Sequence, residues 1–212
     1  MTDLADRRAR KRQETRRAIS WAATGLFAEK GFDNVTIDEI AAEADVGRMT
    51  VFNHFPRKED MFFDRDDEIR TTLAEALRQR DPAESPIESL RLLAHRLISE
   101  QRPYLQFSPE SRGFIATIKA SETLKARARA IRDEVANGVA VELARSAGRE
   151  DSDADAALAA SLLLATWSVA LIRAHEEYAQ TLDAEQSAAI FLSLVDKGAV
   201  GQKAALAGTP YV

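Results

Sequence analysis

Side chains that can contact a nucleic acid occur together in a short segment, residues 47–54. On a helix over residues 48–54, the outward face would carry Arg48, Met49, Thr50, Asn53 and His54. A helix fits the DNA major groove, where arginine pairs with guanine, asparagine with adenine, and an apolar group contacts the thymine methyl. We therefore expect Arg48 and Met49 to contact base edges, and Asn53 to contact an adenine or a phosphate.

Four polar groups are suited to contact the phosphate backbone of DNA, and such contacts fix the register of a protein on DNA. These groups belong to Thr36, Thr50, His54 and Lys58. A helical hairpin with a polar exterior would present the same side chains without binding DNA. For Asn53 or Met49 taken alone, this interpretation explains the exposed side chain as well as contact with a base does.

The segment before residue 47 has the pattern of a helix that could position this face. Its apolar residues follow the i, i+3, i+4, i+7 spacing of one helical side, at Ile37, Ile40, Ala41 and Ala44. Thr36 and Glu39 match a Thr-x-x-Glu capping box, which defines where the helix begins. Residues 45–47 then predict a tight turn between two helices.

Two more helices complete the expected unit. Val51 and Phe55 supply the inner side of the short helix, and residues 18–30 carry an apolar stripe on a longer first helix. Helices as short as 37–44 and 48–54 do not fold alone. We therefore predict a three-helix helix-turn-helix unit packed around Phe27, Ile40, Val51 and Phe55.

The rest of the chain is also helical in pattern, and no segment shows the sustained period-two alternation of a strand. We predict an all-α protein with helices over residues 7–30, 37–44, 48–54, 57–80, 86–101, 110–120, 122–147, 153–179 and 184–207. The most apolar segment, 156–172, is shorter than the roughly 20 residues of a bilayer span. Charged residues flank it, so we interpret it as a buried helix.

Composition narrows the possible functions. The chain has 212 residues, a formal net charge of -5 and no cysteine. The lack of cysteine excludes disulfide frameworks, thiol catalysis and Cys-ligated zinc. The N-terminal charges are not followed by the apolar region of a secretory signal, so we expect a cytoplasmic protein. Residues 7–17 contain seven Lys or Arg and one Glu, which is the arrangement expected if this end meets a polyanion.

The sequence resembles the TetR family of transcriptional regulators over roughly residues 13–62. Three elements carry the resemblance: LFAEKGFDNVTIDEIA, A-x-A-x-V-x-x-x-T-V-F-x-H-F and P-x-K-E-x-M. By this resemblance the DNA-contacting positions are Thr36, Arg48, Thr50, Phe52, Asn53, His54 and Lys58. Lys58 falls where the family uses a lysine at the start of its fourth helix.

Three positions depart from the family pattern. Asp45 stands where the family usually has glycine, and aspartate tolerates a positive φ better than most residues with a side chain. Gly47 replaces the usual serine N-cap, which glycine can substitute at a modest energetic loss. Phe52 replaces the usual tyrosine, so the hydroxyl contact to a phosphate is lost.

The resemblance implies two domains. These are a helix-turn-helix DNA-binding domain over residues 7–56 and a helical effector-binding and dimerisation domain over 57–208. The last two helices, 153–179 and 184–207, would form a four-helix bundle with the same pair of a second copy. Their composition agrees, because a helix that is apolar on nearly all sides must be covered on all sides.

A homodimer with twofold symmetry predicts a palindromic operator. Two recognition helices would read it about 34–36 Å apart, or at the wider spacing of a family variant. By the resemblance we expect a repressor that leaves double-stranded DNA when a small-molecule effector, whose identity is unknown, stabilises a conformation unable to match successive grooves.

Aromatic side chains are the candidates for the effector pocket, because ligand pockets are mostly apolar and aromatic. They are Phe63, Phe107, Phe114 and Trp167, together with Tyr104. Packing in the hydrophobic core explains each of these residues more simply.

Two other classes of function remain as alternatives: a small all-helical enzyme, and a membrane-surface module that uses the basic N-terminal helix. The sequence has no G-x-S-x-G, H-E-x-x-H, Walker or G-x-G-x-x-G motif. We therefore expect no catalytic site, cofactor, metal or membrane partner. Liposome binding in place of sequence-selective DNA binding would favour the membrane module.

Overall fold

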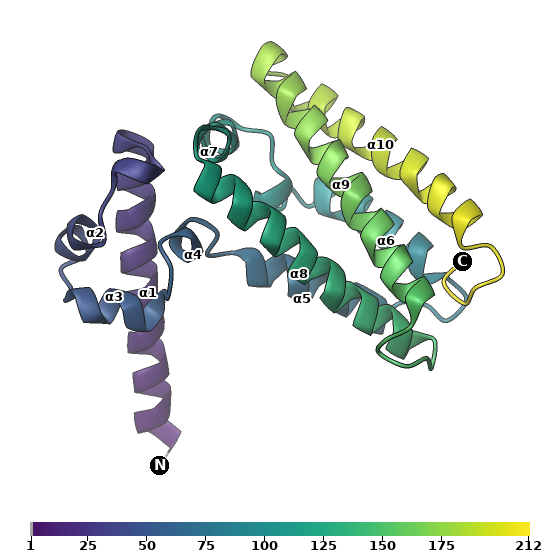
Figure 1. Ribbon diagram of the computed structural model, residues 1–212, viewed down its shortest axis with the longest axis horizontal. Coiled ribbons are helices and arrows are strands. Elements are labelled where there is room, and N and C mark those ends of the chain that lie inside the picture. Colours follow the sequence, from purple (N-terminus) through teal and green to yellow (C-terminus); the bar gives the residue numbers. More distant parts are fainter. Residues whose placement is uncertain (1) are drawn as a thin grey trace. The chain divides into compact units, whose positions relative to one another are not determined.

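The computed structural model describes residues 2–212, and all regular secondary structure in this range is helical. The elements are α1 (Thr2–Lys30), η1 (Phe32–Asn34), α2 (Ile37–Glu43), α3 (Arg48–His54), α4 (Glu59–Phe62), α5 (Asp66–Arg78), α6 (Pro86–Ser99), η2 (Pro103–Leu105), α7 (Pro109–Ala120), α8 (Glu122–Ser146), α9 (Ala154–Thr181) and α10 (Ala184–Ala205). The expectation of an all-α protein is confirmed (Figure 1).

Backbone contacts divide the chain into two compact units. The first contains Met1–Arg65 and Ala116–Arg127, and the second contains Asp66–Ile115 and Ala128–Val212. The first unit thus extends beyond the expected DNA-binding segment, 7–56, and includes α4 and the start of α8. Burial is the physical reason, because Met61 of α4 and Leu124 of α8 are fully enclosed in the first unit's core.

The core of the first unit contains the four residues that the sequence predicts. Phe27, Ile40, Val51 and Phe55 are each at most 2% exposed. Phe32 of η1 joins them, and its ring centroid lies 4.9 Å from that of Phe27. Tertiary packing therefore stabilises the seven-residue helices α2 and α3, which are too short to be stable alone.

The prediction of one helix over residues 57–80 is wrong, because the chain forms α4 and α5 with a turn at residues 63–65. Consecutive residues such as Phe62 and Phe63 point to different sides of a helix. Where the helix is interrupted, both rings pack against the first core, with their centroids 5.1 Å apart. In the same turn, Asp64 accepts a hydrogen bond from the hydroxyl of Ser20 on α1.

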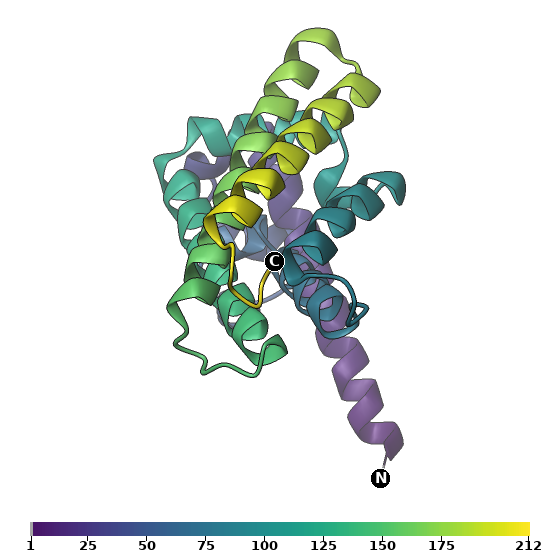
Figure 2. The same cartoon turned by 90° about the vertical axis from the view of Figure 1, so that its right-hand side faces the viewer.

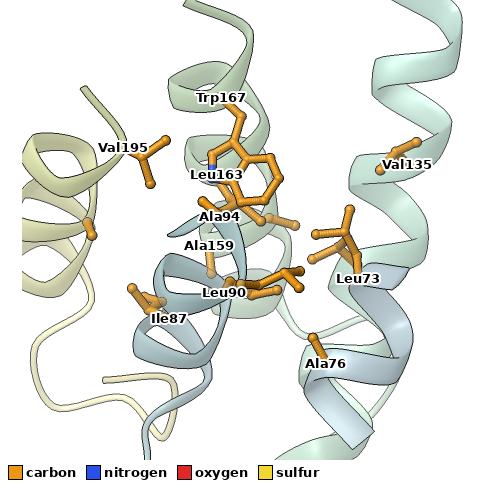
Figure 3. Close-up of a cluster of buried hydrophobic side chains, with 14 of the residues drawn as sticks. Leu73, Ala76, Ile87, Leu90, Ala94, Val135, Ala159, Leu163, Trp167 and Val195 are labelled. Carbon is orange, nitrogen blue, oxygen red and sulfur yellow. The ribbon is translucent and has the colours of Figure 1, made fainter. Parts of the chain in front are cut away.

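The second unit has a core of leucine, alanine and aromatic side chains from α5, α6, α8, α9 and α10 (Figure 3). Helices α9 and α10 lie side by side, and α6 packs against α10 (Figures 1 and 2). Trp167 of α9 packs edge-on against Phe191 of α10, with ring centroids 6.1 Å apart. Asp153 and Asp183 cap these two long helices by accepting backbone N–H groups of their first turns.

Helix α9 has a buried side and an exposed apolar side. Leu163 and Trp167 lie in the core, whereas Leu158, Val169 and Ile172 are 45%, 54% and 52% exposed. By length and composition alone, α9 is also apolar enough to cross a membrane. Core helices meet the same criterion. The interpretation of residues 156–172 as a buried helix holds for one side of α9 only, because its other side is exposed in the single chain.

Helices α9 and α10 are in close contact at Gly198. A Cβ atom added at Gly198 would lie 2.2 Å from Cγ2 of Thr166, and 3.0 Å from its Cβ. A rotation of the Thr166 side chain could move Cγ2 but not Cβ. Any side chain at position 198 would therefore push the two helices apart.

We expect Gly198→Ala to lower the free energy of unfolding by about 1–3 kcal/mol, because overpacking forces the backbone to shift. Urea unfolding followed by circular dichroism would measure the effect. Gly201→Ala is the matched control on the same helix, since no atom lies within 4 Å of its added Cβ. Because alanine has a higher helix propensity than glycine, Gly201→Ala should raise the free energy of unfolding by up to about 1 kcal/mol. Equal midpoints for the two variants would contradict the close contact.

Candidate nucleic-acid interface

The turn between α2 and α3 has the geometry that the sequence predicts. Thr36 and Glu39 form a capping box, in which the Glu39 N–H donates to Thr36 Oγ1 (3.2 Å) and the Thr36 N–H donates to Glu39 Oε2 (2.9 Å). Asp45 has a φ of 51°, so it adopts the left-handed backbone that glycine usually supplies. Gly47 is the N-cap of α3.

Helix α3 has one buried side and one accessible side. Val51 on the buried side is 0% exposed, as is Phe55, which ends the helix. The candidate contact residues lie elsewhere on the helix: Arg48, Met49, Phe52 and Asn53 are exposed, and Thr50 and His54 are partly buried. Their side chains are thus displayed on a short helix that has a rigid apolar backing.

Asp38 of α2 holds the guanidinium of Arg48. Nη1 of Arg48 donates to both carboxylate oxygens of Asp38, at 3.1 and 2.9 Å. The guanidinium carbon also lies 5.6 Å from the centroid of the Phe52 ring. The side chains of Arg48 and Asp38 are 61% and 65% exposed, so the ion pair between them adds little to stability. Its main effect is to fix the direction of the Arg48 side chain.

The Thr36 hydroxyl, a predicted phosphate contact, is engaged within the protein. It donates to Oε2 of Glu39 at 2.9 Å, and the ammonium of Lys30 donates to Oε1 of the same carboxylate at 2.8 Å. The hydrogen bond from Lys30, followed by those from Thr36, lowers the pKa of Glu39 to about 2. A phosphate that binds the Thr36 hydroxyl must therefore replace an ionised carboxylate as acceptor.

Arg16 of α1 contacts the C-terminal end of α3. Its Nη1 donates to the carbonyl oxygen of His54 (2.7 Å), and its guanidinium carbon lies 4.0 Å from the centroid of the Phe55 ring. Partial burial, followed by the positive charges of Arg12 and Arg16, lowers the pKa of His54 below its ordinary value of 6.5. The imidazole is therefore neutral at pH 7.

Lys58 lies beyond α3, next to the start of α4. Its Nζ donates to the carbonyl oxygens of Phe32 and Val35, both at 2.9 Å, and lies 4.3 Å from the centroid of the Phe32 ring. Two of the three ammonium hydrogens are thus used inside the first unit. Lys58 ties η1, which directly precedes the capping box, to the beginning of α4.

The aromatic candidates for an effector pocket do not all belong to one core. Phe63 belongs to the first unit. In the second unit, Phe107 and Trp167 are buried in the core, Tyr104 is partly buried against it, and Phe114 on α7 is 39% exposed. Three of the five residues therefore share one core, and Phe63 and Phe114 lie outside it.

A cavity of about 620 Å³ lies in the second unit along α5 and α6, and none of these aromatic residues lines it. Its walls include charges of both signs, from Arg80, Arg96, Arg102, Glu75, Glu84 and Glu100. Its volume is in the ordinary range for small-molecule sites. Among the described residues, no group of three or more side chains is placed to hold a metal ion, in this cavity or elsewhere.

Sequence reasoning missed two residues that position this surface. Asp38 and Arg16 contact Arg48 and His54 across helix pairs, at separations of 10 and 38 residues along the chain. No spacing rule within one helix relates such partners. The only signals were an acidic residue in the first turn of α2 and a basic segment before the first apolar stripe.

Lys58→Met should lower the free energy of unfolding by about 1–3 kcal/mol, because two carbonyl oxygens lose a charged donor while the chain length is kept. Arg57→Met is the matched control, since Arg57 is exposed and its replacement should change stability by less than about 0.5 kcal/mol. Urea unfolding of both variants measures the difference. If the two variants unfold at the same urea concentration, the bonds from Lys58 to η1 do not stabilise the unit.

Comparisons with known proteins agree with this geometry. Residues 19–64 match the family described as bacterial regulatory proteins, tetR family. The regulator YhgD of Bacillus subtilis is 34% identical over 86 residues, which is 40% of this chain and 43% of that protein. The repressor Rv3405c of Mycobacterium tuberculosis is 38% identical over 73 residues, which is 34% of this chain and 39% of that protein. The chain thus spans less than half the length of these relatives.

A solved structure extends the similarity of fold beyond the first unit. The complex of the Stenotrophomonas maltophilia repressor SmeT with triclosan aligns with a TM-score of 0.56 and 19% identity, over 89% of this chain and 91% of that one. At this identity the match concerns the fold alone. Residues 19–64 thus match the tetR family of bacterial regulatory proteins, and the fold of a repressor is shared along most of the chain.

Proposed function

We propose that this protein is a cytoplasmic transcriptional repressor that binds a palindromic DNA operator as a homodimer and leaves it when a small-molecule effector binds. The observation that carries the proposal is the accessible polar side of α3, backed by the fully buried Val51 and Phe55. A recognition helix held in this way fits the major groove of DNA. The relative Rv3405c is named a repressor, which supports repression over activation.

Arg48 is the residue that we expect to read a base. Asp38 occupies Nη1 of Arg48, which leaves Nε and Nη2 without a partner in the described part of the chain. Two parallel N–H groups match the O6 and N7 acceptors of guanine. Asp38 would thus orient Arg48 before DNA arrives, so that less side-chain entropy is lost on binding.

The neighbouring side chains complete the proposed contacts. Met49, at 72% exposure, is free to contact a thymine methyl, and Asn53 an adenine or a phosphate. Thr50 and His54 lie at the edges of the helix, where phosphates pass. Phe52 has no hydroxyl to offer, and its ring restricts the Arg48 guanidinium instead.

The specific binding is tested with duplexes selected from a random library and measured by fluorescence anisotropy. Arg48→Ala should reduce the preference for the selected duplex over a scrambled one by about 1–3 kcal/mol. Arg48→Lys is the sharper comparison, since it keeps the charge and loses the two-pronged donor. We expect it to bind scrambled DNA like the wild type and to lose the preference for the guanine. Equal wild-type binding to selected and scrambled duplexes would refute the proposed function, as would binding to liposomes alone.

The proposed dimer uses the exposed stripe of α9. Leu158, Leu162, Ala165, Val169 and Ile172 follow one side of this helix at spacings of three and four residues, and all five are at least partly exposed. A second copy of the chain would bury this stripe under twofold symmetry. The same symmetry places two α3 helices on one operator, which is why we expect the operator to be palindromic.

Val169→Asp should convert the dimer to a monomer in sedimentation, because a carboxylate would be buried without a partner. The monomer should retain its fold and lose most of its affinity for the full palindrome. Leu92→Asp is the matched control, since Leu92 is exposed to a comparable extent, at 41%, and lies on α6, where it lines the cavity and is not part of the stripe. A Val169→Asp protein that sediments as a dimer would exclude this interface.

The effector is the remaining part of the proposal. The SmeT structure contains triclosan, so a protein with this fold accommodates a small molecule. In the present chain, the cavity along α5 and α6 is the candidate site, and its mixed charges favour a ligand with several hydrogen-bonding groups over a purely apolar one. Screening metabolites for release of the selected duplex would identify it.

A further inference from the structure

We propose that a row of arginines on the first half of α1, formed by Arg8, Arg12 and Arg16, is a second DNA-binding element. This arginine row would bind phosphates that flank the base pairs contacted by α3. The inference rests on the proposed function, because it assumes that α3 binds DNA. It adds a contact surface outside the helix-turn-helix motif.

Residues 7–14 of α1 have no packing role in the first unit. The buried side of α1 begins at Ile19, whereas the described side chains from Arg7 to Glu14 are all exposed. Figure 1 shows this part of α1 extending past α3, beyond the other helices of the first unit. A helix that continues for several turns beyond its core buries nothing in the free protein, so packing does not explain these turns.

Arg16 fixes which side of α1 faces the end of α3. It reaches both the carbonyl oxygen of His54 and the ring of Phe55. Residues four positions apart lie on nearly the same side of a helix, about 6 Å apart along its axis. Arg12 and Arg8 therefore extend the row from Arg16 outward by about 6 and 12 Å.

The electrostatics of His54 place Arg12 near the same end of α3. After desolvation, Arg12 is the next cause of the lowered pKa of His54, ahead of Arg16. His54 is itself a candidate phosphate contact. The arginine row and the edge of α3 can therefore meet one continuous stretch of phosphate backbone.

No described carboxylate pairs with the charges of this row. Arg8 and Arg12 form no ion pair or hydrogen bond with any described residue, whereas Arg10 lies 3.5 Å from Glu14. Like charges four residues apart destabilise a helix, and positive charges near a helix N-terminus oppose its dipole. A polyanion would remove both costs, and DNA is the polyanion that lies against α3 in the proposed complex.

The test compares two double variants of the full-length protein that lose the same charge. Arg8→Gln with Arg12→Gln removes two members of the row, and Arg10→Gln with Lys11→Gln removes two charges from other sides of α1. Glutamine keeps a helix propensity close to that of arginine and lysine. The affinity for DNA is measured at several salt concentrations on two duplexes. One contains the selected operator with additional base pairs on both sides, and the other contains the operator alone.

On the duplex with flanks, we expect the Arg8/Arg12 variant to bind more weakly, with a salt slope less steep by about 1.8 per subunit, since each phosphate contributes about 0.9. The Arg10/Lys11 variant should retain the wild-type slope. On the duplex without flanks, the wild type and the Arg8/Arg12 variant should bind alike. The preference for selected over scrambled sequence should stay unchanged throughout.

Several results would overturn the inference while leaving the proposed function intact. They are equal slopes for the two double variants, or an affinity of the wild type that does not depend on flanking base pairs. Binding of phosphatidylserine vesicles that requires Arg8 and Arg12, without any effect of flanking DNA, would assign the row to a membrane surface instead. A wild type that binds scrambled and selected duplexes equally would refute the proposed function itself.

Discussion

The burial of Val51 and Phe55 is the constraint on which the rest of the first unit depends. Helix α3 has only seven residues, and a helix of that length does not persist in water. It exists because one side fills a core made by α1, α2 and η1. The same burial fixes the direction of every side chain on the opposite side, so the stability of the unit and the orientation of its polar surface are a single physical property.

Polar contacts from neighbouring helices then restrict the side chains at the edges of α3. Asp38 holds Arg48 from α2, and Arg16 holds the last turn from α1. Lys58 acts one step further away, because it fixes η1 and thereby the start of α2. The ion pair of Arg48 and Asp38 is exposed and contributes little energy. The combined effect of these contacts is to limit the conformations available to the surface that we assign to DNA.

Much of this arrangement could be predicted from the sequence. The capping box at Thr36 and the buried Phe27, Ile40, Val51 and Phe55 follow from local spacing, and the structure confirms them. The left-handed backbone at Asp45 follows from the resemblance to a family that usually has glycine at this position. The break between α4 and α5 could not be predicted in this way, because it arises from the packing of two consecutive phenylalanines against a core elsewhere in the chain. The contacts of Asp38, Arg16 and Lys58 depend on how helices cross, which a linear pattern does not encode.

The glycine at position 198 has a consequence for the way the second unit can move. Thr166 fits against α10 only where that helix has no side chain. Sliding α10 by four residues, about 6 Å, would bring Leu194 or Gln202 opposite Thr166, and neither leaves the necessary space. The contact at Gly198 therefore opposes such a shift between the two helices. A ligand that reshapes this unit would move α9 and α10 together more easily than past each other.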